Sequence, residues 1–414
     1  MVRMLSLLAR RPGYRRLWLG ELISLMGDWL SYVAVSLLAL RTGGGALSLA
    51  LVFAAHALPS ALVSPLAGWL ADRFDRKSLL VGSQLAQAAL TGGMLLAAVN
   101  GELVALQATL FLRNTLAGVV HPAKQAAMTQ LLEGDELVDA NALDAATWSL
   151  SFTLGTALGG VMATLDPFFA LAIDTLSFIV AAWILAGLPS LAVRRENGAP
   201  LRMRGSMRAA LRHALERPGL FEAVFAKTPM AVAGGAGWVL LNLTAGELGG
   251  AAGAGLALGL LQAVRGAGTG VGPLLAKNLT ARGISVAALL RASVALSLLS
   301  VALFALAGGW ALLLALVLLW GMGGGGSWVF SSSAIQQLSS ESFVGRTSAL
   351  DQLAFTLGMA SAALATGLAI DAGIGPASAV LAAVAFGGAL YVGMLLVQPP
   401  HPRRQAASTA GAAE

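Results

Sequence analysis

Long runs of apolar residues recur along the whole of this 414-residue chain, and they constrain its fold more than any other feature. Each run approaches the roughly 20 residues that an α-helix needs to cross the hydrocarbon core of a bilayer. Apolar residues make up 57% of the chain and charged residues only 11%, against about 25% charged residues in a soluble domain. The runs do not alternate with polar residues, as the strands of a membrane barrel do. The sequence therefore predicts an all-α integral membrane protein.

Glycines, prolines and charges divide these runs into twelve predicted transmembrane helices, arranged as two six-helix bundles related by pseudo-symmetry. The helices are expected near residues 17–40, 46–71, 78–99, 103–122, 141–165, 167–188, 220–244, 252–276, 284–307, 309–338, 346–370 and 374–397. Many arginines lie between the sixth and seventh helices, in a stretch too charged to be buried. We predict an N-terminal bundle in 1–188, a cytoplasmic linker in 189–219, a C-terminal bundle in 220–398 and a cytoplasmic tail in 399–414.

The distribution of lysine and arginine predicts the orientation of the chain. Most of these residues fall on the side that holds both termini, the 72–77 loop and the linker, whereas the opposite loops hold only Arg41. Cytoplasmic loops carry the excess of positive charge. We therefore expect both termini in the cytoplasm, with the protein in the inner (plasma) membrane. We also expect no removable signal peptide. The protein is expected to be a monomer in contact with lipid. The scattered basic residues predict no nucleic acid partner, and a chain without cysteine has no thiolate metal site.

Short segments of the two predicted bundles repeat one another. Ala142-Leu143-Asp144 reappears as Ala349-Leu350-Asp351, and Gln130-Leu131 reappears as Gln337-Leu338. Transporters are often built from repeated halves that move about a central site. The repetition supports two related six-helix halves independently of hydropathy.

The stretch after the second predicted helix carries a dense pattern of charges. It reads Gly68-Trp69-Leu70-Ala71-Asp72-Arg73-Phe74-Asp75-Arg76-Lys77. It resembles the loop signature of the major facilitator superfamily, in which a glycine, an Asp-Arg pair and a basic pair link helices 2 and 3. The resemblance implies a gating cluster that latches the two halves together in one conformation, made up of Gly68, Asp72, Arg73, Arg76 and Lys77.

A glycine pattern lies in the fifth predicted helix. The segment Gly155-Thr156-Ala157-Leu158-Gly159-Gly160 resembles the antiporter element of the same superfamily, with threonine in place of its proline. Its glycines, Gly155, Gly159 and Gly160, are expected to permit close helix packing. Gly27-Asp28-Trp29 and His121-Pro122-Ala123 resemble the branch of drug, macrolide and enterobactin exporters. The resemblance implies transport by alternating access driven by a proton gradient, with no cofactor.

Ionisable residues inside the predicted helices are the candidates for a coupling and solute site. Each costs about 2.5–3.5 kcal/mol at the bilayer centre, so those present usually face a cavity or a partner. Asp28 and Arg113 lie near the middle of helices 1 and 4, and we expect them to face each other. A carboxylate beside a movable arginine can exchange a proton, but a fixed structural ion pair explains the same residues. The remaining candidates for proton coupling or the solute cavity are Glu21, His56, Asp174, Lys227 and Arg265.

Asp144 and Asp351 occupy matching positions at the predicted starts of helices 5 and 11. A carboxylate stabilises the N-terminus of a helix, so we assign both to structure and gating. Trp148 and Trp238 are candidates to stack on an aromatic solute.

These features predict a secondary transporter and not an enzyme, because no nucleophile, base and orienting group converge in the sequence. The expected solute is a hydrophobic or amphiphilic small molecule, exported in exchange for protons. A siderophore exporter or a lipid translocator of the same fold is the nearest alternative, and the lipid translocator would need no proton. A non-transporting membrane sensor would have no need for buried charges on several helices.

Overall fold

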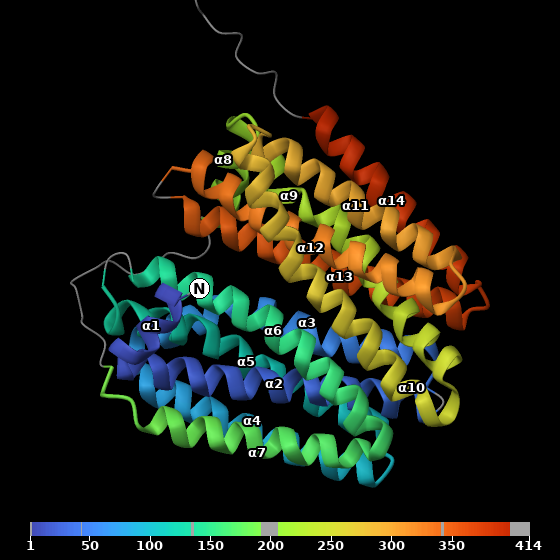
Figure 1. Ribbon diagram of the computed structural model, residues 1–414, viewed down its shortest axis with the longest axis horizontal. Helices are drawn as coiled ribbons and strands as arrows, with labels where there is room; N and C mark the ends of the chain where they lie inside the picture. The colour runs from blue at the N-terminus through green and yellow to red at the C-terminus, as the bar shows by residue number, and fades with distance from the viewer. Residues whose placement is uncertain (1, 43, 134–135, 192–205, 341–342, 398–414) are drawn as a thin grey trace, which may run out of the picture.

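The computed structural model describes residues 2–42, 44–133, 136–191, 206–340 and 343–397, which form fourteen α-helices and no strand (Figure 1). The predicted all-α class is therefore confirmed. The helices are α1 (Val2–Arg10), α2 (Pro12–Arg41), α3 (Gly45–Arg73), α4 (Arg76–Val99), α5 (Leu103–Leu131), α6 (Glu136–Leu165), α7 (Pro167–Ala186), α8 (Ser206–Glu216), α9 (Leu220–Phe225), α10 (Lys227–Ala281), α11 (Val286–Leu306), α12 (Trp310–Leu338), α13 (Val344–Asp371) and α14 (Pro376–Val397).

Eleven helical segments within the described residues are long and apolar enough to cross a membrane. One of them begins in α9 and ends at Gly250, inside the 55-residue α10. At about 1.5 Å per residue, an unbroken α10 would extend far beyond a hydrocarbon core of roughly 30 Å. Gly250 interrupts the helix with a φ of 57°, a conformation that glycine adopts readily. The second arm of α10, residues 251–281, is a further long helical segment that is not among the eleven, so the predicted count of twelve stays a prediction.

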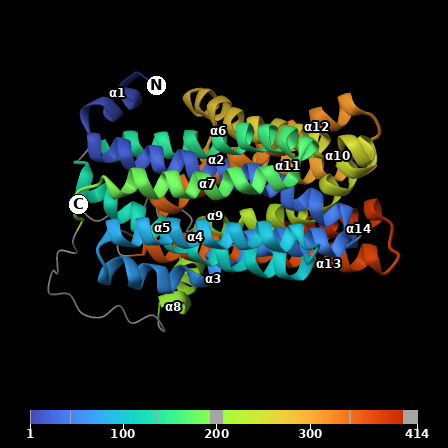
Figure 2. The same ribbon diagram turned by 90° about the horizontal axis from the view of Figure 1, so that it is seen from below.

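The long helices gather in two groups. Figure 1 shows α1–α7, coloured blue to green, packed together, and α9–α14, coloured yellow-green to red, packed together; in Figure 2, seen from below, α4 and α7 of the first group lie in front. The two groups meet mainly along α6 with α10 and along α3 with α13. Of the predicted linker, residues 192–205 lie outside the described part of the chain, and the rest includes the short helix α8. The predicted tail, 399–414, also lies outside it, so the proposed segment boundaries stay predictions.

Several predicted helix ends are wrong. α5 continues through Pro122 to Leu131, because a membrane helix tolerates a proline when its neighbours satisfy the freed backbone group. α6 begins at Glu136 and α13 begins at Val344, earlier than the predicted starts. Asp144 and Asp351 consequently lie inside their helices and do not stabilise N-termini as predicted.

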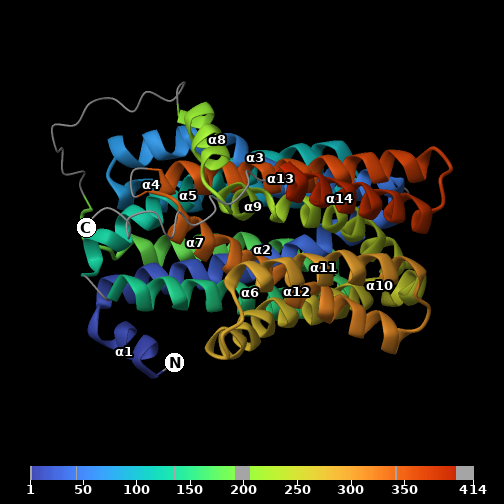
Figure 3. The same ribbon diagram turned by 90° about the horizontal axis from the view of Figure 1, so that it is seen from above.

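The two groups are joined at one end of the molecule by a hydrogen-bonded carboxylate. The Asp371 side chain, at the end of α13, accepts hydrogen bonds from the backbone N–H groups of Ala46 (2.8 Å) and Leu47 (3.1 Å). These N–H groups belong to the first turn of α3, where the helix itself supplies no acceptor. We call this the Asp371 end. The opposite end of α3, where Asp75 follows the helix, is the Asp75 end. Figure 3 shows α1 towards the Asp75 end and the labelled part of α10 towards the Asp371 end.

Candidate functional site

A buried cluster of one arginine and two aspartates lies among α2, α5 and α7. Nη2 of Arg113 lies 3.0 Å from Oδ1 of Asp28, and Nη1 of Arg113 lies 2.9 Å from Oδ2 of Asp174. The expected pairing of Asp28 with Arg113 is therefore present in the structure. Asp174 adds a second carboxylate to it. We call these three residues the acidic triad.

The acidic triad is almost completely removed from solvent. The side chains of Arg113 and Asp174 are 1% and 0% exposed, whereas that of Asp28 is 19% exposed. Ser177 donates a hydrogen bond to Asp174 Oδ1 at 3.3 Å. With both carboxylates ionised, the triad carries one net negative charge in a poorly hydrated place, and such a charge is costly. One added proton would neutralise it.

Lys124 stands between two further carboxylates. Its Nζ lies 2.5 Å from Oε1 of Glu21 and 2.7 Å from Oδ2 of Asp144. The sequence interpretation placed Lys124 in a loop, and it missed this group because α5 is longer than predicted. The two assemblies share a composition of one cation and two carboxylates.

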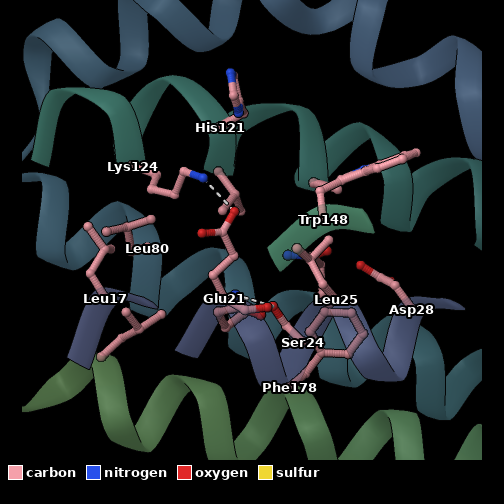
Figure 4. Close-up of a pocket in the computed structure, with 15 residues that line it drawn as sticks. Leu17, Glu21, Ser24, Leu25, Asp28, Leu80, His121, Lys124, Trp148 and Phe178 are labelled. Atoms are coloured by element: carbon pink, nitrogen blue, oxygen red, sulfur yellow. Dashed lines mark hydrogen bonds and ion pairs between the residues drawn. The ribbon is translucent and has the colours of Figure 1, made fainter. Parts of the chain in front are cut away.

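A cavity of about 180 Å³ links these two groups of charges. Glu21, Lys124 and Asp28 line it, together with Trp148 and a largely apolar wall. Figure 4 shows Lys124 and Glu21 pointing toward each other, with Asp28 and Trp148 farther along the cavity. Sites for drug-sized ligands usually have about 300–1,000 Å³, so this cavity accommodates a small solute or part of a larger one.

Aromatic side chains surround His56, another predicted site residue. Its ring centroid lies 5.2 Å from that of Trp29 and 5.1 Å from that of Tyr32. Nε1 of Trp238 donates a hydrogen bond to the Tyr32 hydroxyl at 2.5 Å. The structure thus places His56 in an aromatic cluster, and this cluster spans the two groups of helices because Trp238 belongs to α10.

Two predicted cations of the C-terminal group are both buried. Nζ of Lys227 lies 2.7 Å from Oδ2 of Asp351, and the side chains are 1% and 6% exposed. Lys227 also lies 4.0 Å from the ring centroid of Trp328. Asp351 matches Asp144 in the sequence repeat, so each half places a lysine against the repeated aspartate. Arg265 lies on the second arm of α10, 3.9 Å from the ring centroid of Trp238.

The glycines of the fifth predicted helix serve two different contacts. A Cβ at Gly155 would lie 2.8 Å from Cβ of Trp29, and one at Gly159 would lie 2.7 Å from the Leu30 carbonyl oxygen, both on α2. A Cβ at Gly160 would instead lie 2.8 Å from Cα of Gly259, on α10. Gly160 therefore packs across the boundary between the two groups, which the sequence pattern alone did not distinguish.

The predicted gating loop is only partly described. Only the backbone of Gly68 and Asp72 lies within the described part of the structure. Arg73 and Arg76 both interact with other residues, and Lys77 is partly buried. The structure does not therefore test the predicted latch.

Asp75, in the same loop, has contacts that the sequence analysis did not anticipate. Its carboxylate accepts hydrogen bonds from the Ser78 backbone N–H at 2.9 Å and the Leu191 backbone N–H at 2.8 Å. Although burial alone would raise the pKa of Asp75, the hydrogen bonds from Ser78 and Leu191 outweigh it and lower the pKa. The sequence did contain a signal for this contact: an aspartate directly before a predicted helix is a common N-cap, and its side chain accepts a hydrogen bond from a backbone N–H of the first turn.

The sequence analysis did not identify one further ion pair, between α11 and the short helix α9. Arg291 donates to both carboxylate oxygens of Glu222, each at 2.7 Å. Its side chain is 51% exposed, so this pair lies at the border of the protein and not in the central cavity.

Comparison with known sequences matches nearly the whole chain to one family. The family model is described as transmembrane secretion effector, and it matches residues 7–410. The uncharacterized MFS-type transporter YfiS of Bacillus subtilis (strain 168) is 29% identical over 196 residues, which are 47% of this chain and 46% of that protein. Macrolide efflux protein A of Streptococcus pyogenes is 25% identical over 173 residues, 41% of this chain and 43% of that protein. The chain thus spans less than half the length of these curated relatives.

Solved structures share the fold over most of the chain. The nucleoside transporter NupG aligns with a TM-score of 0.72 and 13% identity, covering 92% of this chain and 98% of that one. A bacterial homologue of the iron transporter ferroportin in an inward-facing state aligns with a TM-score of 0.68 and 16% identity, with the same coverage. At these identities the likeness concerns the fold alone.

Proposed function

The chain belongs to the transmembrane secretion effector family of major facilitator transporters, and we propose that it exports hydrophobic or amphiphilic small molecules in exchange for protons. It is a multi-pass membrane protein with relatives of the efflux type. The proposal adds the coupling ion, the solute class and the direction of transport. One observation carries it: Asp28 belongs both to the acidic triad and to the wall of the cavity.

This double placement supports competition between a proton and a solute. A proton on the acidic triad removes its net negative charge and so weakens the hold of Arg113 on one carboxylate. A solute that enters the cavity contacts Asp28 and changes its surroundings. Each ligand therefore alters the free energy of binding of the other, which is the requirement for exchange.

Alternating access is the proposed way in which this competition drives export. The hydrogen bonds of Asp371 to α3 and the close contact of Gly160 with Gly259 hold the Asp371 end closed. We place the Asp75 end in the cytoplasm of a cell with the protein in its plasma membrane, as the distribution of basic residues favours. Solute would then enter the cavity from the cytoplasm and leave after the Asp371 end opens.

Uptake into inside-out vesicles tests the proposal, with a proton gradient acidic inside. The probes are a radiolabelled macrolide, because one relative carries that name, and three naphthyl compounds of different charge: 1-naphthaleneacetate, 1-naphthaleneacetamide and 1-naphthylmethylamine. At least one probe is expected to accumulate, and accumulation should stop with an uncoupler and in Asp28→Asn and Asp174→Asn. Glu102→Gln, which neutralises an exposed carboxylate outside the triad, is the matched control and should accumulate the probe normally.

Two results would contradict proton exchange through the acidic triad. Uptake that persists in both aspartate variants and with the uncoupler would favour a lipid translocator or facilitated diffusion. Accumulation lost equally in Glu102→Gln would mean that neutralising any carboxylate disables the protein, and the acidic triad would have no special part.

A further inference from the structure

Arg265 is a buried cation without a carboxylate partner among the described residues. Only 8% of the residue is exposed. Its Nε donates to Oε1 of Gln262 at 3.2 Å, the one hydrogen bond from its guanidinium to a described residue. Arg113, Lys124 and Lys227, the other buried cations, each lie within 3.0 Å of a carboxylate oxygen. Arg265 therefore differs from every buried cation with which it can be compared.

Aromatic rings take the place of a counter-charge around Arg265. Its guanidinium carbon lies 3.9 Å from the ring centroid of Trp238 and 4.9 Å from those of Phe152 and Trp320. Rings stabilise a guanidinium through its faces, whereas its N–H donors point outward from its edges. Nε uses one edge, and the terminal nitrogens have no carboxylate to bind. We call Arg265 and these three rings the arginine cage.

The arginine cage lies between the two groups of helices and next to the cavity. Phe152 belongs to α6, whereas Trp238 and Trp320 belong to α10 and α12. Phe152 also stacks on Trp148, with ring centroids 5.5 Å apart, and Trp148 lines the cavity. A movement between the groups would therefore separate Phe152 from Arg265 and join the cage to the cavity.

We propose that the arginine cage is a binding subsite for the oxyanion, a carboxylate or phosphate, of an amphiphilic solute. The planar fork of a guanidinium matches such groups with two parallel hydrogen bonds. The apolar body of the solute lies along Trp148 and the apolar wall of the cavity. This inference rests on the proposed transport function and adds to it the charge of the solute.

Equilibrium dialysis of the purified full chain in phosphatidylcholine nanodiscs tests the subsite. The probes are radiolabelled 1-naphthaleneacetate and its neutral amide, and no proton gradient is present. Arg265→Gln should weaken binding of the acetate by about tenfold or more, as expected for a lost charge-assisted pair, with little change for the amide. Arg265→Lys, which keeps the charge but lacks the fork, should give an intermediate loss. Arg282→Gln, an exposed arginine just beyond α10, is the matched control and should bind as the native chain does.

The ratio of acetate to amide affinity decides the outcome. If Arg265→Gln does not fold, a reduced ratio in Arg265→Lys still supports the subsite. An unchanged ratio in the folded variants, or an equal loss for both probes, would overturn it. Competition by phosphatidylglycerol added to the nanodiscs would identify a lipid headgroup as the source of the oxyanion, and competition by 1-naphthyl phosphate alone a small solute. Because no gradient is used, failure of proton exchange would leave this result unaffected.

Discussion

Nη1 of Arg113 lies 2.9 Å from Oδ2 of Asp174, with both side chains almost completely buried. Asp28 lies on the other side of the same guanidinium, 3.0 Å from Nη2. One cation is therefore shared by two largely buried carboxylates that water screens little, and breaking such a group is costly. A proton is the simplest species that neutralises the net negative charge of this group. The proposed coupling rests on that neutralisation.

The buried pair of Lys227 and Asp351 gives a prediction about stability. Lys227→Met should lower the free energy of unfolding by about 3–5 kcal/mol, because it leaves Asp351 charged and unpaired inside the protein. The double variant Lys227→Met with Asp351→Leu should recover most of the loss. Unfolding in detergent, followed by circular dichroism, measures both effects.

An exposed ion pair supplies the control for that measurement. Arg212 and Glu216 lie 2.7 Å apart on α8 with side chains 82% and 59% exposed, so Arg212→Met should cost no more than about 1 kcal/mol. Equal losses in Arg212→Met and Lys227→Met would contradict the assignment of Lys227 to a buried pair.

The long helices could be predicted because hydrophobic length is a local property of the sequence. Their ends could not, since they depend on packing: α5 continues through Pro122, and α6 begins well before Asp144. For that reason Lys124 appeared to be a loop residue, although it lies inside the helix and beside the cavity.

The sequence indicated which residues belong to the site better than it indicated which of them contact one another. The depth of Asp28 and Arg113 in their helices indicated a pair, and the structure contains it. The position of Asp174 on the same guanidinium depends on how α7 is rotated, which hydropathy does not determine. Arg265 was recognisable as a buried charge, but its surrounding rings come from segments far apart in the chain.

The glycine contact between α6 and α10 should control the equilibrium between the closed and open forms of the Asp371 end. A Cβ at Gly259 would lie 2.6 Å from Cα of Gly160, so Gly259→Leu should open the Asp371 end. The native chain has no cysteine, so spin labels can be introduced at Leu165 and Ile374 alone. Double electron–electron resonance should report a distribution of distances between the two labels that is longer and broader than in the unsubstituted protein. Gly253→Leu, where a Cβ meets nothing within 4 Å, should keep the native distance, and a native distance in Gly259→Leu would refute the prediction.

The hydrogen bonds of Asp75 should make the stability of the folded protein depend on pH. The pKa of Asp75 is lowered from 3.8 by the hydrogen bonds described above, so its stabilising effect is present above pH 3.8 and is lost as the pH falls through the lowered value. The difference in melting temperature between the native chain and Asp75→Asn should stay constant from neutral pH to about pH 4 and shrink below it. A difference that disappears already near pH 6 would contradict this assignment.

Release of protons on solute binding tests the central claim most directly. The purified chain, in weakly buffered detergent solution with a pH indicator, receives the probe that the vesicle assay identifies as transported. The account predicts release of up to about one proton per bound solute, since one proton neutralises the acidic triad, and no release from Asp28→Asn or Asp174→Asn. Saturable binding of the solute to the native chain without any release of protons would contradict it.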